Sequence, residues 1–169
     1  GFSILCMLIT ICRYPASTFK ASLKTAVKYA FRIEVHGLEN LDKVSKPYII
    51  IPNHNSYLEP PILGGMLAGR YMFPINPEAG KILAVRLTEA FWQKLPMSPN
   101  RPMMLKPFIH GLKHGKLGII FPEGQRSPIG KIGKIYPGAA FSAKLTQSTL
   151  IPVILDGSQY NVSSRMETK

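Results

Sequence analysis

The stretch that decides the fold is YIIIPNHNSYLEPP, residues 48–61. It opens with a continuous apolar run, Tyr48–Pro52, which is typical of a strand buried on both faces of a parallel sheet. A polar cluster, Asn53–Glu59, follows at once. The two prolines after it are tolerated in the first turn of a helix, where amide donors have no partner in any case. The stretch therefore predicts a buried strand, a polar turn and then a helix.

Strand and helix patterns alternate along the rest of the chain. Strand patterns occur in RIEVHG, RYMFPI, KLGIIFPEG and TLIPVILDG, at residues 32–37, 70–75, 116–124 and 149–157. Helical patterns occur in PPILGGMLAG and GAAFSAKL, and in two sets of apolar residues at helical spacing, Leu83, Leu87, Phe91, Leu95 and Leu105, Phe108, Ile109, Leu112. This alternation predicts an α/β fold with a mostly parallel central sheet flanked by helices.

The composition narrows the class of partner. A chain of 169 residues suits one domain, and 21 Lys and Arg against 9 Asp and Glu give a formal charge of +12. An anionic partner is therefore expected: nucleic acid, an anionic membrane or a phosphorylated substrate. The sequence contains no recognition-helix pattern, RNA-binding strand motif or zinc finger, which argues against nucleic acid. Cys6 and Cys12 lie close together in an apolar stretch and indicate neither a disulfide framework nor a cysteine metal site.

The first 31 residues differ in character from the rest. The apolar start, Gly1–Cys12, is shorter than the roughly 20 residues of a membrane-spanning helix, so it fits the end of a span, a signal-like stretch, an interfacial helix or a core helix. Cations then recur every four residues from Lys20 to Arg32, beside apolar residues. This pattern favours a basic amphipathic helix on anionic lipid, and it also fits the solvated face of a core-packed helix.

We therefore expect a membrane-associating helical segment at residues 1–31 and the α/β domain at residues 32–169. Because the chain begins at Gly1 rather than Met, we also expect it to be a fragment of a longer protein.

His54 and Glu59 form a candidate catalytic pair. A histidine acts as a general base only when its tautomer is fixed, and a carboxylate that accepts the other ring N–H fixes it. The spacing alone also fits a surface turn. A second polar cluster, Glu123–Ser127, follows another apolar strand, and the carboxyl ends of parallel strands meet at one edge of a sheet. That placement favours a site over a surface turn.

The second cluster, in FPEGQRSPIGKIGK, suits a phosphate group. Arg126 offers a bidentate guanidinium, Gly124 allows close backbone approach, and Ser127, Lys131 and Lys134 add donors. A nucleotide-binding phosphate loop is excluded because the spacing of its glycines and the residue after Lys131 are wrong. A zinc-peptidase helix is excluded as well, because HGLKH lacks the glutamate between its two histidines.

Three motifs, NHNSYLE, FPEGQRS and IPVILDG, together resemble the glycerophospholipid acyltransferase family, the PlsC-type enzymes typified by lysophosphatidic acid acyltransferases. The family's Asn-His, four residues and Asp matches Asn53, His54 and, in place of the aspartate, Glu59. Its Phe-Pro-Glu-Gly-Thr-Arg-Ser matches residues 121–127 with Gln125 for threonine, and its Ile/Val-Pro-Val matches residues 151–153. The chain looks most like the acyltransferase half of bacterial bifunctional acylglycerophosphoethanolamine acyltransferase and acyl-carrier-protein synthetase, in which an adenylate-forming domain follows.

The resemblance implies a lysophospholipid acyltransferase on the cytoplasmic face of the bacterial inner membrane, with no metal and no cofactor besides its acyl-CoA or acyl-carrier-protein donor. His54 would be the general base, and Glu59 would orient it. The remaining candidate residues would bind the lysophospholipid acceptor: Asn53, Arg101, Glu123, Gly124, Arg126 and Ser127. An anionic membrane surface is the expected partner. The alternative is a catalytically degenerate membrane-binding or phospholipid-binding module.

Overall fold

The computed structural model describes residues 25, 29, 32–67, 69–78, 92–97, 105–127 and 131–158. Within them five strands form one sheet, in the order β3-β2-β4-β1-β5, and every adjacent pair is parallel. The strands are β1 (Tyr48–Pro52), β2 (Tyr71–Ile75), β3 (Trp92–Pro96), β4 (Leu117–Ile119) and β5 (Thr149–Val153). The helices are the 3-10 helix η1 (Leu38–Lys43) and the α-helices α3 (Glu59–Met66), α5 (Lys106–Lys113) and α6 (Gly138–Thr146). The α/β fold predicted from the sequence is confirmed.

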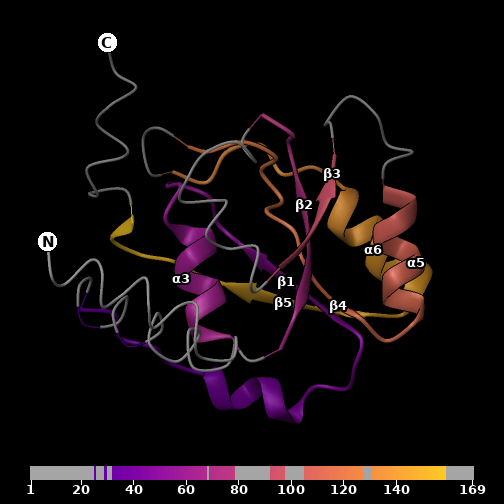
Figure 1. Ribbon diagram of the computed structural model, residues 1–169, viewed down its shortest axis with the longest axis horizontal. Helices are drawn as coiled ribbons and strands as arrows, with labels where there is room; N and C mark the ends of the chain where they lie inside the picture. The colour runs from indigo at the N-terminus through magenta and orange to yellow at the C-terminus, as the bar shows by residue number, and fades with distance from the viewer. Residues whose placement is uncertain are drawn as a thin grey trace, which may run out of the picture.

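The helices cover both faces of the sheet, with α3 on one side and α5 and α6 on the other (Figure 1). Successive residues of β1 point to opposite faces, so Ile50 packs in the cluster that holds Leu63 of α3, while Ile49 packs with Phe108 and Leu112 of α5. Because both faces are buried, β1 is apolar throughout, as its sequence predicted.

Two glycines allow α5 to lie close to the sheet. A Cβ on Gly118 of β4 would stand 2.3 Å from the ring of Phe108, and a Cβ on Gly111 of α5 would stand 2.1 Å from the sulfur of Met72. Both distances are far inside van der Waals contact, so a side chain at Gly118 would displace the buried ring of Phe108 and one at Gly111 would displace the end of the Met72 side chain.

The sequence-based prediction was wrong at two segments. Leu95 was expected in a helix, but it lies in β3, which pairs with β2 over its whole length. A four-residue spacing is also a multiple of the two-residue repeat of a strand, so it does not separate the two structures. Residues 32–37 were expected to form a strand, but they lie outside the sheet, and Val35 is 42% exposed. With so little apolar surface buried there, extended pairing gains little.

Several predicted features lie outside the described residues. They include nearly all of the N-terminal helical segment 1–31, the predicted helix up to Phe91, and Arg101. Among the described residues, no helix is both long and apolar enough to cross a membrane.

Candidate active site

The site lies where β1 and β4 end. These strands are parallel neighbours, so the polar residues that follow each of them leave the sheet at the same edge. The two segments then bond to each other. The amide of Ser127 donates to the carbonyl of His54 at 2.7 Å, and the amide of His54 donates to Oε1 of Glu123 at 2.9 Å. The structure thus brings the two polar clusters together.

His54 and Glu59 are in direct contact. Nδ1 of His54 lies 2.7 Å from Oε2 of Glu59, the first residue of α3. The Glu59 side chain is fully buried and that of His54 is 16% exposed, and the imidazole stacks on the ring of Phe121 with centroids 4.1 Å apart. With the proton on Nδ1 held by the carboxylate, Nε2 carries the lone pair and can accept a proton.

Glu59 is further held by two groups on its other oxygen. Oε1 accepts the amide of Asn55 at 2.8 Å and the hydroxyl of Ser158 at 2.7 Å. A buried carboxylate keeps its charge only when hydrogen bonds replace the water it has lost. These two bonds also leave Oε2 directed at His54, so the extra methylene of glutamate relative to the family's aspartate is accommodated.

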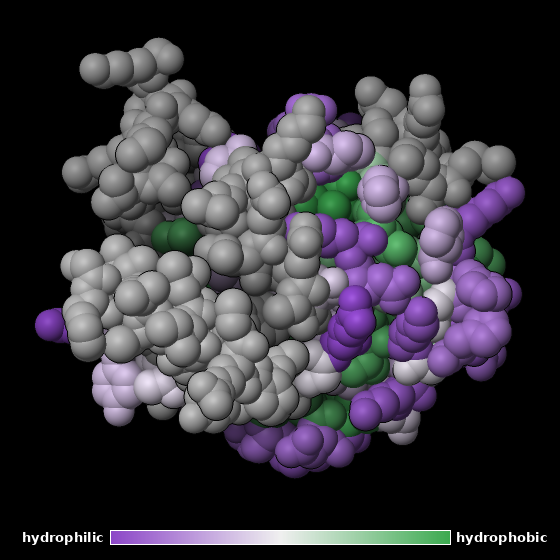
Figure 2. All heavy atoms as spheres, in the orientation of Figure 1, coloured by the Kyte–Doolittle hydropathy of each residue, from purple (hydrophilic) through white to green (hydrophobic). Residues whose placement is uncertain are grey.

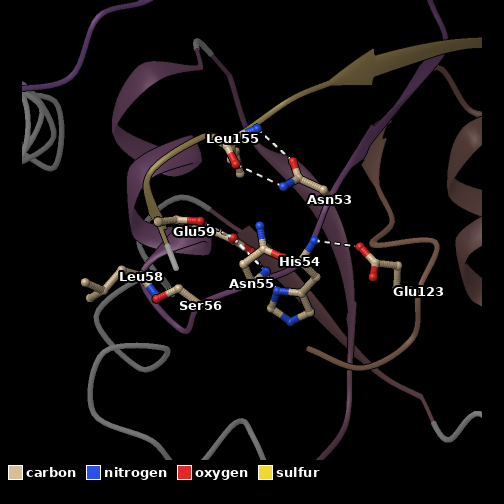
Figure 3. A network of polar contacts seen from close by, with 9 residues as sticks. Asn53, His54, Asn55, Ser56, Leu58, Glu59, Glu123 and Leu155 are labelled. Atoms are coloured by element: carbon tan, nitrogen blue, oxygen red, sulfur yellow. Dashed lines mark hydrogen bonds and ion pairs between the residues drawn. The ribbon is translucent and has the colours of Figure 1, made fainter. Parts of the chain in front are cut away.

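Two further predicted residues join the strand ends to one another. Asn53 exchanges a pair of hydrogen bonds with the backbone of Leu155, which follows β5, at 2.9 and 2.7 Å. Glu123 is buried, and its second oxygen accepts the amide of Gly133 at 2.9 Å. Figure 3 shows Asn53 bonded to the backbone of Leu155 and the amide of His54 bonded to Glu123. The polar atoms of Asn53 and Glu123 contact protein groups, so they shape the site.

A pocket of about 200 Å³ lies beside the pair. Its lining includes Arg126 and Ser127 together with Lys131 and Lys134. The guanidinium carbon of Arg126 lies over the ring of Tyr57, 3.6 Å from the centroid. Three cations around one pocket suit a phosphate group.

His54 itself does not line this pocket. It adjoins the pocket through Glu123 and Ser127, which are pocket residues that bond to its backbone.

Gly124 lies in the turn after Phe121, with a positive φ of 66°, and its amide donates to the Phe121 carbonyl at 3.1 Å. This left-handed conformation favours glycine, so Gly124 shapes the loop that presents Arg126. Within the described residues, no group of three histidine, cysteine or acidic side chains is placed to hold a metal ion.

Ser158 and Tyr57 were not identified from the sequence. A signal for Ser158 existed, because it follows a third parallel strand, β5, and the segments after such strands gather at one edge. Tyr57 lies inside the NHNSYLE motif. Its stacking on Arg126 depends on the path of two loops, which no spacing rule gives.

Comparison with known proteins identifies the relatives of this chain. The model of the family described as Acyltransferase matches residues 32–156. A 1-acyl-sn-glycerol-3-phosphate acyltransferase of Pseudomonas aeruginosa is 30% identical over 142 residues, which are 80% of this chain and 54% of that protein. The chloroplastic 1-acyl-sn-glycerol-3-phosphate acyltransferase of Arabidopsis thaliana is 29% identical over 136 residues, 75% of this chain and 36% of that protein. The chain thus spans from about a third to about half the length of these curated relatives.

A solved structure shows the same fold. The crystal structure of the 1-acyl-sn-glycerophosphate acyltransferase PlsC of Thermotoga maritima superposes with a TM-score of 0.67 at 23% identity. The match covers 96% of this chain and 69% of that one.

Proposed function

The chain belongs to the acyltransferase family, and from that premise we propose that it transfers a fatty acyl group from a thioester to the free hydroxyl of a lysoglycerophospholipid. The observation that carries the proposal is the buried contact of Glu59 with His54 Nδ1 at 2.7 Å, beside a pocket lined by Arg126 and two lysines. The names of the curated relatives support the acceptor class.

The chemistry assigned to His54 is direct transfer. Nε2 removes the proton of the acceptor hydroxyl while that oxygen attacks the thioester carbonyl carbon. The tetrahedral intermediate then collapses, the carbon–sulfur bond breaks, and the imidazolium returns the proton to the leaving thiolate. No covalent acyl-enzyme forms. Glu59 holds the tautomer and stabilises the imidazolium.

The pocket acts by positioning. Arg126, Lys131 and Lys134 would bind the phosphate of the acceptor, so that its glycerol hydroxyl lies within reach of Nε2. Arg101, which lies outside the described residues, stays a predicted contributor.

The finer features remain predictions. They are the choice between acyl-CoA and acyl-carrier protein, the fused adenylate-forming domain, the membrane-associating segment at residues 1–31 and the cytoplasmic face of the bacterial inner membrane. The chain's basic charge of +12 suits an anionic membrane surface as partner.

A product analysis tests the proposal. The purified chain is offered lysophosphatidic acid or lysophosphatidylethanolamine with acyl-CoA or acyl-carrier protein, and products are identified by mass. We expect a diacyl phospholipid to form from at least one pair. Loss of thioester that yields only free fatty acid, or no reaction with any pair, would refute transfer to a lysophospholipid.

A further inference from the structure

A second feature of the molecule begins at the same pocket. The loop of residues 131–137 and the helix α6 expose large apolar side chains next to lysines. Five such side chains have exposed fractions between 42% and 70%: Ile132, Ile135, Tyr136, Phe141 and Leu145. We refer to these five residues as the apolar strip. Clustered exposure of this kind is unusual on a soluble surface and indicates a contact partner.

The five residues of the strip lie within one short stretch of sequence, residues 132–145. The amide of Phe141 donates to the carbonyl of Pro137 at 2.8 Å, so the loop leads directly into the helix. Phe141 and Leu145 are one helical turn apart on α6 and therefore neighbours on its surface. On the right of Figure 2, where α5 and α6 lie in Figure 1, hydrophobic and hydrophilic side chains are mixed.

The charged residues within the stretch 131–145 are all lysines. Lys131, Lys134 and Lys144 are exposed between its apolar members. The sequence from Gly124 to Leu155 contains no aspartate or glutamate. Lysines that extend past apolar neighbours to reach phosphates are the pattern of a surface lying in the headgroup region of an anionic bilayer.

The strip also shares residues with the pocket. Lys131, Ile132 and Lys134 line the pocket beside Arg126, so one loop forms both the pocket wall and the exposed surface. A membrane contact through this loop would place the pocket opening at the depth where phospholipid headgroups lie.

We propose that the apolar strip docks the domain onto an anionic phospholipid bilayer, so that a lysophospholipid passes from the membrane into the Arg126 pocket without entering bulk water. The entry route rests on the proposed function, whereas the docking itself does not. This proposed contact involves residues 132–145, and it is a different prediction from the membrane association expected of residues 1–31.

The test uses the double variant Ile135→Ser/Phe141→Ser, because neither residue lines the pocket. Both side chains are exposed, and circular dichroism with thermal unfolding checks that the variant folds. Sedimentation with phosphatidylcholine vesicles, with and without phosphatidylglycerol, measures binding. We expect wild type to bind the anionic vesicles more tightly than the neutral ones. The variant should bind the anionic vesicles at least about tenfold more weakly than wild type does. Unchanged affinity in the folded variant, or binding by wild type to an acidic protein but not to vesicles, would overturn the proposal.

A matched control is Val35→Ser/Leu38→Ser, which removes two exposed apolar side chains that precede β1. This variant is expected to bind like wild type, and an equal loss of affinity would contradict the assignment to the strip.

Activity separates the two proposals. With a short-chain, fully dissolved lysophospholipid the strip variant should turn over like wild type, and with vesicle-embedded acceptor it should be several-fold slower. If wild type binds the vesicles through the strip but transfers no acyl group, only the proposed function is refuted. If wild type transfers acyl groups and the strip variant binds the vesicles as tightly as wild type, only the docking proposal is refuted.

Discussion

At the scale of single residues, the central feature is a carboxylate with no exposed surface. Glu59 accepts hydrogen bonds from His54, Asn55 and Ser158, and it begins α3, where the helix dipole favours a negative charge. Together these contacts hold the carboxylate against the imidazole, which is the position that the proposed base mechanism requires.

Two substitutions at Glu59 separate the effect of the carboxylate charge on kcat from the effect of side-chain length. Glu59→Gln keeps the shape but removes the charge, so we expect kcat to fall about 100-fold or more. Glu59→Asp withdraws the carboxylate by about 1.5 Å from partners fitted to glutamate, and kcat should fall by a smaller factor. Initial rates of acyl transfer measure both. An Asp variant faster than wild type would show that the glutamate is a defect and would favour the degenerate binding module.

Ser158 should act on catalysis through Glu59. Because its hydroxyl bonds to a buried carboxylate, Ser158→Ala should lower kcat about tenfold with little change in KM, and Ser158→Thr should restore it. The control is Ser142→Ala, since this buried hydroxyl bonds to a carbonyl within α6. If the Ser142 change lowers kcat equally, or threonine fails to restore it, the positioning role is wrong.

Tyr57 should hold in place the Arg126 guanidinium that we propose as the phosphate ligand. Loss of the ring in Tyr57→Leu is expected to raise KM for a phosphorylated acceptor several-fold, with a smaller effect on kcat, because Arg126 loses its stacking surface. Tyr57→Phe keeps the ring and should bind like wild type. Isothermal titration with lysophosphatidic acid gives the same comparison without turnover, and equal affinity of the Leu and Phe variants would argue against the stacking role.

At the scale of elements, long apolar runs were predictable and short or mixed ones were not. The runs that became β1, β2 and β4 bury most of their side chains, whereas β5, at the edge of the sheet, is only partly buried although its sequence is equally apolar. β3 contains Gln93 and Lys94 between its apolar ends, and it is a strand because β2 provides a paired edge. The pairing of strands is a tertiary property, so the local pattern could not give it.

For the candidate site, the edge of the sheet at which it lies was predictable from the sequence, but the hydrogen bonds within it were not. That His54 and Arg126 lie at one edge follows from the strands that precede them. That Glu123 accepts hydrogen bonds from the amides of His54 and Gly133 depends on loop geometry.

Close packing of α5 on the sheet gives a stability prediction. In Gly118→Ala the new methyl group would overlap the fully buried ring of Phe108, which should cost about 1–3 kcal/mol of unfolding free energy. The matched change Gly138→Ala meets only Leu105 Cδ1 at 3.6 Å and should be neutral or slightly stabilising. Urea unfolding followed by circular dichroism compares them, and equal stability of the two variants would contradict the packing account.

At the scale of the whole molecule, the pocket and the apolar strip share a loop, and the chain as a whole is basic. The formal charge of +12 suits an anionic partner, three cations line the pocket, and the candidate pair His54 and Glu59 lies next to the loop that forms the pocket. We infer that these features serve one task, which is to take a phosphorylated single-chain lipid from a membrane and acylate it.

The measurement that tests this account most directly is the rate of diacyl phospholipid formation by wild type and by His54→Ala, with lysophospholipid binding measured on both. The account predicts that the variant still binds the acceptor but loses at least about 100-fold in rate, because the general base is gone. Substantial turnover by the variant, or acceptor binding by wild type with no acyl transfer from any thioester donor, would contradict it.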